Sequence, residues 1–434
     1  MYPDFEYLLE SLTGSDMPGW LSLFKTFGFL VAMAFLASTY FLMKELQRKE
    51  KLGQLQPTIS KAIIGNPASQ SELFWSAFTG FLLGFKLGGL FSNFESVQSD
   101  PMQYIMSFQG NWLIGLMGAA LLGYIKYAEK KKEQLPAPKE IFIRTYPSQR
   151  ISEIILIAAV GGLAGAKIFN AFETWDSFIQ DPLGSLFSSS GLTFYGGLIV
   201  ATALLYRFAK KYKIPFAQLC DAAAPSLILG YGLGRLGCHF SGDGDWGIFN
   251  SAYISTTNGD LFRAVGGDFQ NALKGSSEYF IRNFGSLANV PHLSITAPSW
   301  LPDWTVAMNY AHNVNNEGMS MTNCMGHYCS VLPVAVFPTP LYEFLTCVII
   351  FLILWFLRKK LNTPWHLFGV YLIFTGIERF LVETIRVNYK YDLGFIQPTQ
   401  AEIISVIMIL AGAAILFFIK KRKSQMPNAN HTAD

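Results

Sequence analysis

Five titratable side chains follow one another at the end of an apolar stretch, in the segment GYGLGRLGCHFSGDGDWG at residues 230–247. They are Arg235, Cys238, His239, Asp243 and Asp245. The residues before them are apolar enough to lie in a membrane, where a charged side chain is rare and indicates a functional site. A guanidinium group at such a boundary can bind a phosphate through two parallel hydrogen bonds.

A second set of charges lies in LFGVYLIFTGIERFLVETIRVN, residues 367–388. Arg379, Glu383 and Arg386 are spaced i, i+4 and i+7, so we expect all three on one face of a helix. Arg379 and Arg235 would repel each other as a structural pair, but together they suit a phosphate, and Glu383 would hold Arg379 in place. The alternative is an Arg379–Glu383 ion pair that needs no ligand, with Arg235 as an interfacial anchor.

Further polar residues are expected at the same level of the membrane. Tyr342 and Glu343 lie in FPTPLYEF at the start of one apolar segment, and Tyr195 starts another. The end of the segment that carries Arg235 also has alternating glycines, at positions 230, 232, 234 and 237. Such glycines either let helices pack closely or let the backbone approach a ligand.

The elements that position these residues are expected to be membrane helices. The chain has 434 residues, of which 51% are hydrophobic and 15% charged, whereas soluble domains carry roughly 25% charged residues. A bilayer core needs about 20 mostly apolar residues per helix. We therefore predict an all-α integral membrane protein with about nine transmembrane helices, near residues 20–43, 73–91, 111–128, 152–172, 193–210, 217–235, 340–357, 366–386 and 400–419.

Lysines and arginines fix the expected orientation, because short loops rich in them stay in the cytoplasm. They follow the first, third, fifth, seventh and ninth predicted spans, for example at Lys130 and Lys210. Acidic residues take the other side, for example at Glu95, Asp100 and Asp176. The N-terminus is therefore predicted outside and the C-terminus inside, with the first span retained because no removable signal is apparent. The net charge of +3 gives no indication of a nucleic-acid partner.

Residues 80–130 are similar to residues 161–211 at a constant offset of 81 positions, without a gap. The shared residues include Lys86 with Lys167 and Asp100-Pro101 with Asp181-Pro182. We interpret this similarity as a duplicated two-span hairpin, with parallel copies because two spans preserve orientation. Each lysine lies inside a span, where it either extends to the outer interface or serves a function.

The long segment between the sixth and seventh spans, residues 248–337, is expected to fold into an external cap. Cys324 and Cys329 lie in it and, on an oxidising face, favour a small disulfide. Free thiols and a metal site that uses His327 are the alternatives, although the spacing is poor for zinc.

Five segments resemble the bacterial prolipoprotein diacylglyceryl transferases, in the order of that family. They are FYGG, DAAAPSLILGYGLGRLGCHFSGDGDWG, FPTPLYE, GIERFLVETIR and QPTQAEIIS. The resemblance covers most of residues 150–415 and, in addition, the first span. The resemblance implies an enzyme that transfers the diacylglyceryl group of phosphatidylglycerol to the lipobox cysteine of prolipoproteins. A thioether forms and glycerol phosphate is released, with no cofactor or metal.

The resemblance also implies a location and partners. The enzyme is expected in the bacterial cytoplasmic (inner) membrane as a multi-pass protein, with its active site toward the periplasmic face. Its partners would be phosphatidylglycerol, other membrane lipids and prolipoprotein signal peptides, which the cap would guide. The rival interpretations are a membrane transporter or lipid carrier, which binds phosphate without chemistry, and a non-catalytic relative.

Carried over by position, the family's functional residues predict most of a site, to which our interpretation of the residues adds His239 and Arg386. The signature arginine falls on Arg235, and the second arginine and its acid fall on Arg379 and Glu383. The catalytic set is Arg235, Arg379, Glu383, His239, Tyr195 and Asp243. The substrate-binding set is Arg235, Arg379, Arg386, Lys167, Gly196, Gly197, Tyr342, Glu343 and Gly247.

The chain departs from the family at several positions. Tyr195 stands where the family has histidine, Cys238 where it has asparagine, and Asp243 where glutamate is usual. His239 is our candidate replacement for the thiol base, since its ordinary pKa suits that role; a solvated or capping histidine is the alternative. The predicted parts are 1–51 (N-terminus and first span), 73–130 (extra hairpin), 150–247 (core motif), 248–337 (cap), 338–423 (last spans) and 424–434 (tail).

Overall fold

The computed structural model describes residues 1–90, 94, 97, 104–105, 107–188, 191–322, 324, 326–388, 390–392, 394 and 397–424. The predictions made for Glu95, Asp100, Pro101 and most of the tail, residues 425–434, lie outside these residues. The chain forms two compact units. The first comprises Met1–Glu45 and Ala217–Asp434, and the second comprises Leu46–Phe216.

Each of the nine predicted spans coincides with a helix. These helices are α2 (Thr26–Lys51), α3 (Gln70–Leu90), α6 (Trp112–Lys132), α7 (Ile151–Glu173), α10 (Phe194–Lys211), α11 (Phe216–Ser241), α14 (Thr339–Leu357), α15 (His366–Glu383) and α16 (Gln400–Ser424). Within the described residues, five are long and apolar enough to cross a membrane: α2, α3, α14, α16, and α7 with the 3₁₀ turn η2 (Pro147–Arg150) before it. The protein is therefore a mostly helical membrane protein, while the count of nine and the orientation stay predictions.

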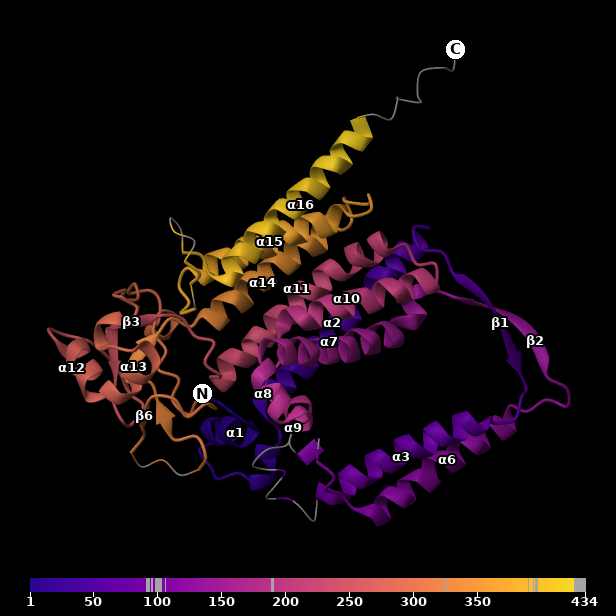
Figure 1. Ribbon diagram of the computed structural model, residues 1–434, viewed down its shortest axis with the longest axis horizontal. Coiled ribbons are helices and arrows are strands. Elements are labelled where there is room, and N and C mark those ends of the chain that lie inside the picture. The colour runs from indigo at the N-terminus through magenta and orange to yellow at the C-terminus, as the bar shows by residue number, and fades with distance from the viewer. Residues whose placement is uncertain are drawn as a thin grey trace. The chain divides into compact units, whose positions relative to one another are not determined.

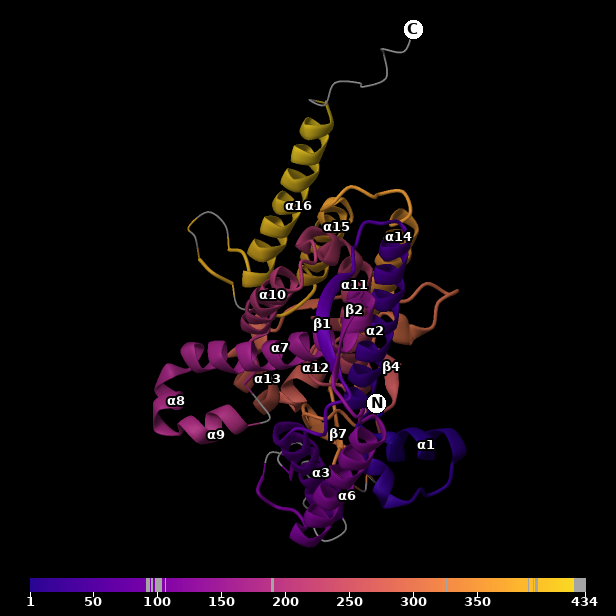
Figure 2. The same ribbon diagram turned by 90° about the vertical axis from the view of Figure 1, so that its right-hand side faces the viewer.

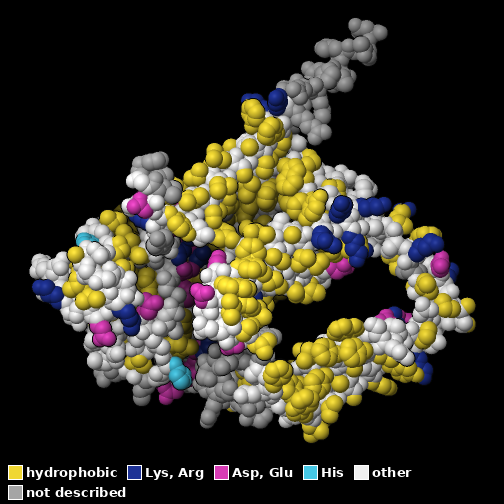
Figure 3. Space-filling view, viewed as in Figure 1, with side chains coloured by type: hydrophobic (Ala, Val, Ile, Leu, Met, Phe, Trp, Pro, Cys, Tyr) yellow, Lys and Arg dark blue, Asp and Glu magenta, His cyan; other side chains and the backbone are white. Residues whose placement is uncertain are grey.

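In the first unit, α11 packs against α2 and α14, and α15 packs against α14 and α16 (Figure 1). Ile228, Cys347 and Leu354 are buried where α11 meets α14. The Asp221 carboxylate of α11 accepts hydrogen bonds from the backbone N–H groups of Trp365 and Phe368, both 2.8 Å. A carboxylate at a helix N-terminus stabilises it, so α11 fixes the start of α15. Apolar side chains cover the outside of α14, α15 and α16 (Figure 3).

Helix packing accounts for most of the alternating glycines of α11. A Cβ atom on Gly230 would lie 2.5 Å from Ser38 Oγ, and one on Gly232 would lie 2.7 Å from Cys347 Cβ. A Cβ atom on Gly237 would lie 3.1 Å from Phe27, whereas one on Gly234 would meet nothing within 4 Å. Close helix approach therefore explains three of the four positions, as small residues in membrane helices commonly do.

Two helix ends differ from the sequence prediction. α11 continues to Ser241, so Cys238 and His239 are helical instead of following the helix. α15 ends at Glu383, and Arg386 lies beyond it in a backbone bridge with Gly247. The expectation that Arg386 shares a helix face with Arg379 and Glu383 is therefore wrong, because the backbone after Glu383 pairs with another segment.

The cap, residues 248–337, folds around a four-stranded sheet of β3 (Phe249–Ser255), β4 (Leu261–Arg263), β5 (His292–Leu293) and β8 (Val334–Val336). Helices α12 (Asp268–Gly275) and α13 (Ser277–Phe284) supply Leu273 and Phe280 to its core. The remaining short elements are β6 (Met319–Ser320), β7 (Ser330–Val331), η3 (Leu287–Asn289) and η4 (Asp303–Thr305). An all-α fold is thus too narrow a description: runs such as FNSAYIS and VAV are rich in residues that favour strands.

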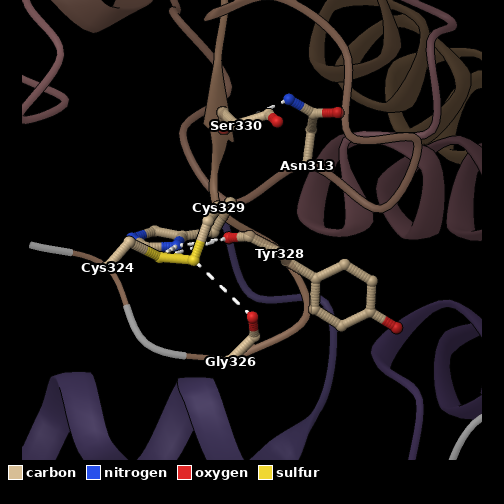
Figure 4. Close-up of a disulfide and its surroundings, with 7 residues drawn as sticks. Asn313, Cys324, Gly326, Tyr328, Cys329 and Ser330 are labelled. Atoms are coloured by element: carbon tan, nitrogen blue, oxygen red, sulfur yellow. Dashed lines mark hydrogen bonds between the residues drawn. A yellow bond between two sulfur atoms is a disulfide. The ribbon is translucent and has the colours of Figure 1, made fainter. Parts of the chain in front are cut away.

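The predicted disulfide is confirmed, because Cys324 and Cys329 are bonded to each other (Figure 4). The loop that they close lies beside α1 (Phe5–Thr13), whose Tyr7 ring contacts the rings of His312 and Tyr328. The η1 turn (Gly19–Leu23) packs on α1 and precedes α2. Since both sulfur atoms are in the disulfide, neither is a free thiolate for a metal.

The second unit consists of two helical hairpins and a ribbon. α3 pairs with α6, and α7 pairs with α10. The ribbon is the antiparallel pair β1 (Thr58–Ile64) and β2 (Lys139–Thr145). Two short helices, α8 (Trp175–Gln180) and α9 (Pro182–Phe187), fold back from the end of α7 (Figure 2).

The two hairpins hold their lysines in the same way. Lys86 Nζ donates to the carbonyl oxygens of Tyr104 and Ser107, and Lys167 Nζ donates to those of Ser185 and Ser188. These acceptors are again 81 positions apart, as a duplication predicts. The shared contacts support a structural role for both lysines, each of which binds backbone carbonyl groups between the two helices of its hairpin. The duplication remains our interpretation.

Widening the α11–α14 contact should destabilise the first unit. In Gly232→Val, the new side chain would have to separate α11 from α14, which we expect to lower the free energy of unfolding by about 1–3 kcal/mol. Gly234→Ala is the control, because a Cβ atom there meets nothing within 4 Å. Thermal unfolding of the detergent-solubilised protein measures both, and equal effects of the two changes would contradict this packing.

Candidate functional site

Six charged side chains of the first unit meet at one end of its helices. They are Arg235 of α11, Asp245 after α11, Glu343 of α14, Arg379 and Glu383 of α15, and Arg386 after α15. We call them the arginine–carboxylate cluster. Segments that are more than 100 residues apart in sequence supply one connected set of ion pairs.

Glu343 is the centre of the cluster. Its side chain is fully buried, and its carboxylate lies 3.0 Å from Arg235 Nε, 2.9 Å from Arg379 Nη1 and 3.4 Å from Arg386 Nη1. The Tyr231 hydroxyl of α11 donates to it at 3.4 Å. One carboxylate therefore connects all three arginines.

Asp245 forms the second connection, because it pairs with both Arg235 and Arg386. Burial acts to raise the pKa of Asp245, but the charges of the two arginines outweigh burial and hold that pKa below its usual value. Asp245 is therefore an anion that joins the end of α11 to the segment after α15.

Asp243 lies differently, although the resemblance assigned the family's acidic position to it. Burial raises the pKa of Asp243, and its Oδ1 accepts a hydrogen bond from the backbone N–H of Asp245 at 3.3 Å. Asp245 is not among the predicted site residues, yet it is the residue that pairs with the arginines. Gly242 and Gly244, at φ +66° and +96°, turn the chain so that Asp245 returns to Arg235. The alternation of glycine and aspartate at residues 242–245 was the feature of the sequence that could have indicated this turn.

Arg379 and Glu383 form the predicted ion pair, with Nη2 and Oε2 3.1 Å apart. The pair is not self-contained, because Arg379 also contacts Glu343. Glu383 accepts a second hydrogen bond from Asn388 Nδ2 at 2.7 Å.

Gly247 is required for close backbone contact. The backbone N–H of Ile248 donates to the carbonyl oxygen of Ile385 at 2.9 Å. A Cβ atom on Gly247 would lie 2.8 Å from that same oxygen. This contact brings Arg386 back to the cluster after α15 has ended.

The cluster is electrically balanced, with three guanidinium groups against three carboxylates. Each guanidinium has five N–H donors and makes two ion-pair contacts within the cluster. As far as the described residues show, each therefore keeps donors for a ligand. Arginines held in fixed positions suit an oxyanion such as a phosphate, and they stabilise negative charge that develops during a reaction.

Two other predicted residues connect the helices to the cap. The Tyr342 hydroxyl donates to the carbonyl oxygen of Thr305 at 2.6 Å. His239 Nδ1 lies 3.1 Å from the Tyr310 hydroxyl. His239 also lines a cavity of about 350 Å³, whose other lining residues are Met1, Tyr2, Phe240, Trp304 and Met308.

The remaining predicted residues belong to the second unit, whereas the cluster lies wholly in the first. Lys167 holds the turn of its hairpin, as described above. Tyr195, Gly196 and Gly197 start α10, and both glycines pack closely against α7, with a Gly196 Cβ atom 2.6 Å from the carbonyl oxygen of Gly165.

Removing the central carboxylate should destabilise the protein. Glu343→Ala leaves three partly buried guanidinium groups without their common partner, and we expect a loss of about 3–5 kcal/mol in the free energy of unfolding. Glu278→Ala removes an exposed glutamate of the cap and should change stability by less than about 0.5 kcal/mol. Denaturant unfolding in detergent measures both variants. Unchanged stability of Glu343→Ala would show that Glu343 does not hold the arginines together.

Three relatives illustrate the similarity of this chain to known proteins, and all three carry the name phosphatidylglycerol–prolipoprotein diacylglyceryl transferase. The protein of Leptospira interrogans is 34% identical over 140 residues, which is 27% of this chain but only 44% of that protein. The protein of Chlorobaculum tepidum is 27% identical over 67% of this chain and 78% of its own length. The protein of Pseudomonas aeruginosa is 24% identical over 73% of this chain and 90% of its own length.

A family model described as prolipoprotein diacylglyceryl transferase matches residues 113–418. The matched part contains all six residues of the arginine–carboxylate cluster, whereas α2 and α3 precede it. The chain therefore belongs to the prolipoprotein diacylglyceryl transferase family.

Proposed function

We propose that this protein transfers the diacylglyceryl group of phosphatidylglycerol to the lipobox cysteine thiol of prolipoproteins. The observation that supports this proposal most directly is the arginine–carboxylate cluster, in which three arginines contact the buried Glu343. A phosphodiester is the group in phosphatidylglycerol that such guanidinium groups recognise. Membership of the family gives the reaction class.

In the proposed reaction, the phosphate of the lipid lies against Arg235, Arg379 and Arg386. The thiolate sulfur of the substrate cysteine forms a bond to the glyceryl carbon. The bond from that carbon to the phosphate oxygen breaks, and the electron pair stays on the oxygen. The leaving glycerol phosphate gains one negative charge, which the arginines stabilise.

We assign to His239 the role of the general base that accepts the proton of the substrate thiol. The thiol has an ordinary pKa near 8.5, so a base increases the fraction of thiolate. His239 lies one helical turn after Arg235 on α11 and lines a cavity with several apolar side chains, which suits the apolar residues around a lipobox cysteine. After the transfer, the imidazolium ion releases the proton to water.

The residues of the second unit have supporting roles in this proposal. Tyr195 is retained from the sequence alone as the residue that orients the phosphate or the thiol, because it stands where the resemblance places a histidine. Gly196 and Gly197 keep α10 close to α7, and Lys167 holds the turn between these helices. In the first unit, Gly247 keeps the segment that carries Arg386 in place, and Tyr342 holds the cap.

We further propose nine membrane spans in the cytoplasmic membrane, with the N-terminus outside and the C-terminus inside. The basic residues that end α6, α10 and α16 support this orientation. The disulfide in the cap fits an oxidising compartment. The active site then faces the periplasm, where the cap guides incoming signal peptides.

Cells depleted of their own transferase provide the test. Expression of this protein should restore the diacylglyceryl group on mature lipoproteins, as scored by mass spectrometry. Arg379→Ala should reduce the transfer by about 10²–10³-fold, because a donor that stabilises the leaving phosphate is lost. Arg207→Ala, at an exposed arginine of α10, should retain activity. Failure of the well-expressed wild type would favour a lipid carrier or a non-catalytic relative.

The base has a separate test, in which purified protein acts on a lipobox peptide. His239→Gln should lower the rate near neutral pH by about 10²-fold or more, since general base catalysis contributes this much. His292→Gln, at an exposed histidine of the cap, is the control. If His239→Gln keeps the full rate and Tyr195→Phe loses it, Tyr195 takes the place of His239 in the mechanism.

A further inference from the structure

A cavity of about 200 Å³ lies between the cap and the arginine–carboxylate cluster. Asp245 and Arg386 of the cluster lie on one wall, and Tyr279, Asn283 and Glu317 of the cap lie on another. We call it the cap cavity. All its lining residues belong to the first unit.

The wall formed by the cap is rigid and rich in acceptors. Tyr279 is buried, and its hydroxyl donates to Glu317 Oε2 at 3.3 Å. Burial, followed by the charge of Glu317, raises the pKa of Tyr279, so its hydroxyl stays a donor. The fully buried Asn313 fixes the backbone of Glu317, since its Oδ1 accepts from the Glu317 N–H at 2.8 Å and its amide donates to the Glu317 carbonyl at 3.0 Å.

Glu317 keeps free acceptor capacity toward the cap cavity. A carboxylate has about four lone-pair positions, and within the described residues Tyr279 and Asn315 donate to it, at 3.3 and 3.5 Å. Hydroxyl groups are donors that satisfy the remaining positions. A second anionic group at Glu317 would be repelled.

The two walls therefore select a ligand with different ends. Arg386, beside its partner Asp245, offers N–H donors to a phosphate. Glu317 accepts hydrogen bonds from neutral hydroxyls, and Asn283 both donates to and accepts from them. The volume corresponds to about six or seven waters at roughly 30 Å³ each, which suits a three-carbon polyol and not an acyl chain.

We propose that the cap cavity binds the glycerol part of the glycerol-phosphate headgroup, with Glu317 and Asn283 as specificity-determining residues. The phosphate lies at Arg386 and the two free hydroxyls lie at Glu317. This assignment rests on the proposed function for the identity of the lipid. It adds that the cap selects the headgroup, in addition to meeting the protein substrate.

Two phospholipids with the same acyl chains provide the kinetic test: phosphatidylglycerol and phosphatidylpropanol, whose three-carbon headgroup has no hydroxyls. The purified wild type should prefer phosphatidylglycerol. Glu317→Gln should lower kcat/KM for phosphatidylglycerol about tenfold, the size expected for a hydrogen bond to a charged acceptor, and leave that for phosphatidylpropanol nearly unchanged. Glu278→Gln removes the same charge from an exposed position of α13 and should preserve the preference.

Calorimetric binding of free glycerol 1-phosphate and propyl phosphate separates this inference from the proposed function. The wild type should bind glycerol phosphate about tenfold more tightly, and Glu317→Gln should bind the two equally. If the wild type transfers from neither lipid but binds with this preference, the transferase proposal fails and the cap cavity stands. If Glu317→Gln keeps the wild-type preference in both measurements, the cap cavity does not bind the headgroup.

Discussion

The contact of one buried carboxylate with three arginines is the interaction on which the first unit depends. Charges in apolar surroundings must be paired or strongly hydrogen-bonded. Glu343 meets this requirement for Arg235, Arg379 and Arg386 at once. Helices α11, α14 and α15 can therefore bring like charges together at one end, where arginines alone would repel each other.

Other contacts of the first unit hold the helix ends that carry the arginine–carboxylate cluster in place. Gly232 lets α11 approach α14 at Cys347, one helical turn after Glu343. Asp221 of α11 caps the start of α15. Gly247 brings the segment after α15 back to the cluster through backbone contact. Each device acts on the backbone, so the arginines are positioned by the fold before a ligand arrives.

The sequence alone predicted a helix at each of the nine positions, and five of these helices are, in the described part of the chain, long and apolar enough to cross a membrane. It also predicted the Arg379–Glu383 pair from helical spacing. It failed where contacts between distant segments decide the structure. Asp245 replaces Asp243 at the arginines because two glycines at positive φ turn the chain. Arg386 leaves its helix because a backbone bridge to Gly247 takes over. Strands β3 and β8 of the cap pair across 80 residues or more, as Phe249 does with Val336, and no local pattern specifies such partners.

The electrical balance of the cluster bears on how a lipid enzyme selects its substrate. Three guanidinium groups that already face three carboxylates carry little net charge, so they bind a small anion through hydrogen bonds from fixed N–H donors more than through long-range attraction. A phospholipid differs from such anions because its acyl chains are held in the bilayer, which keeps its phosphate near the helix ends. In the proposed reaction, the arginines orient that phosphate and stabilise the negative charge of the leaving group. A separate wall of the cap, with Glu317 opposite Arg386, is the place where headgroup chemistry can be distinguished.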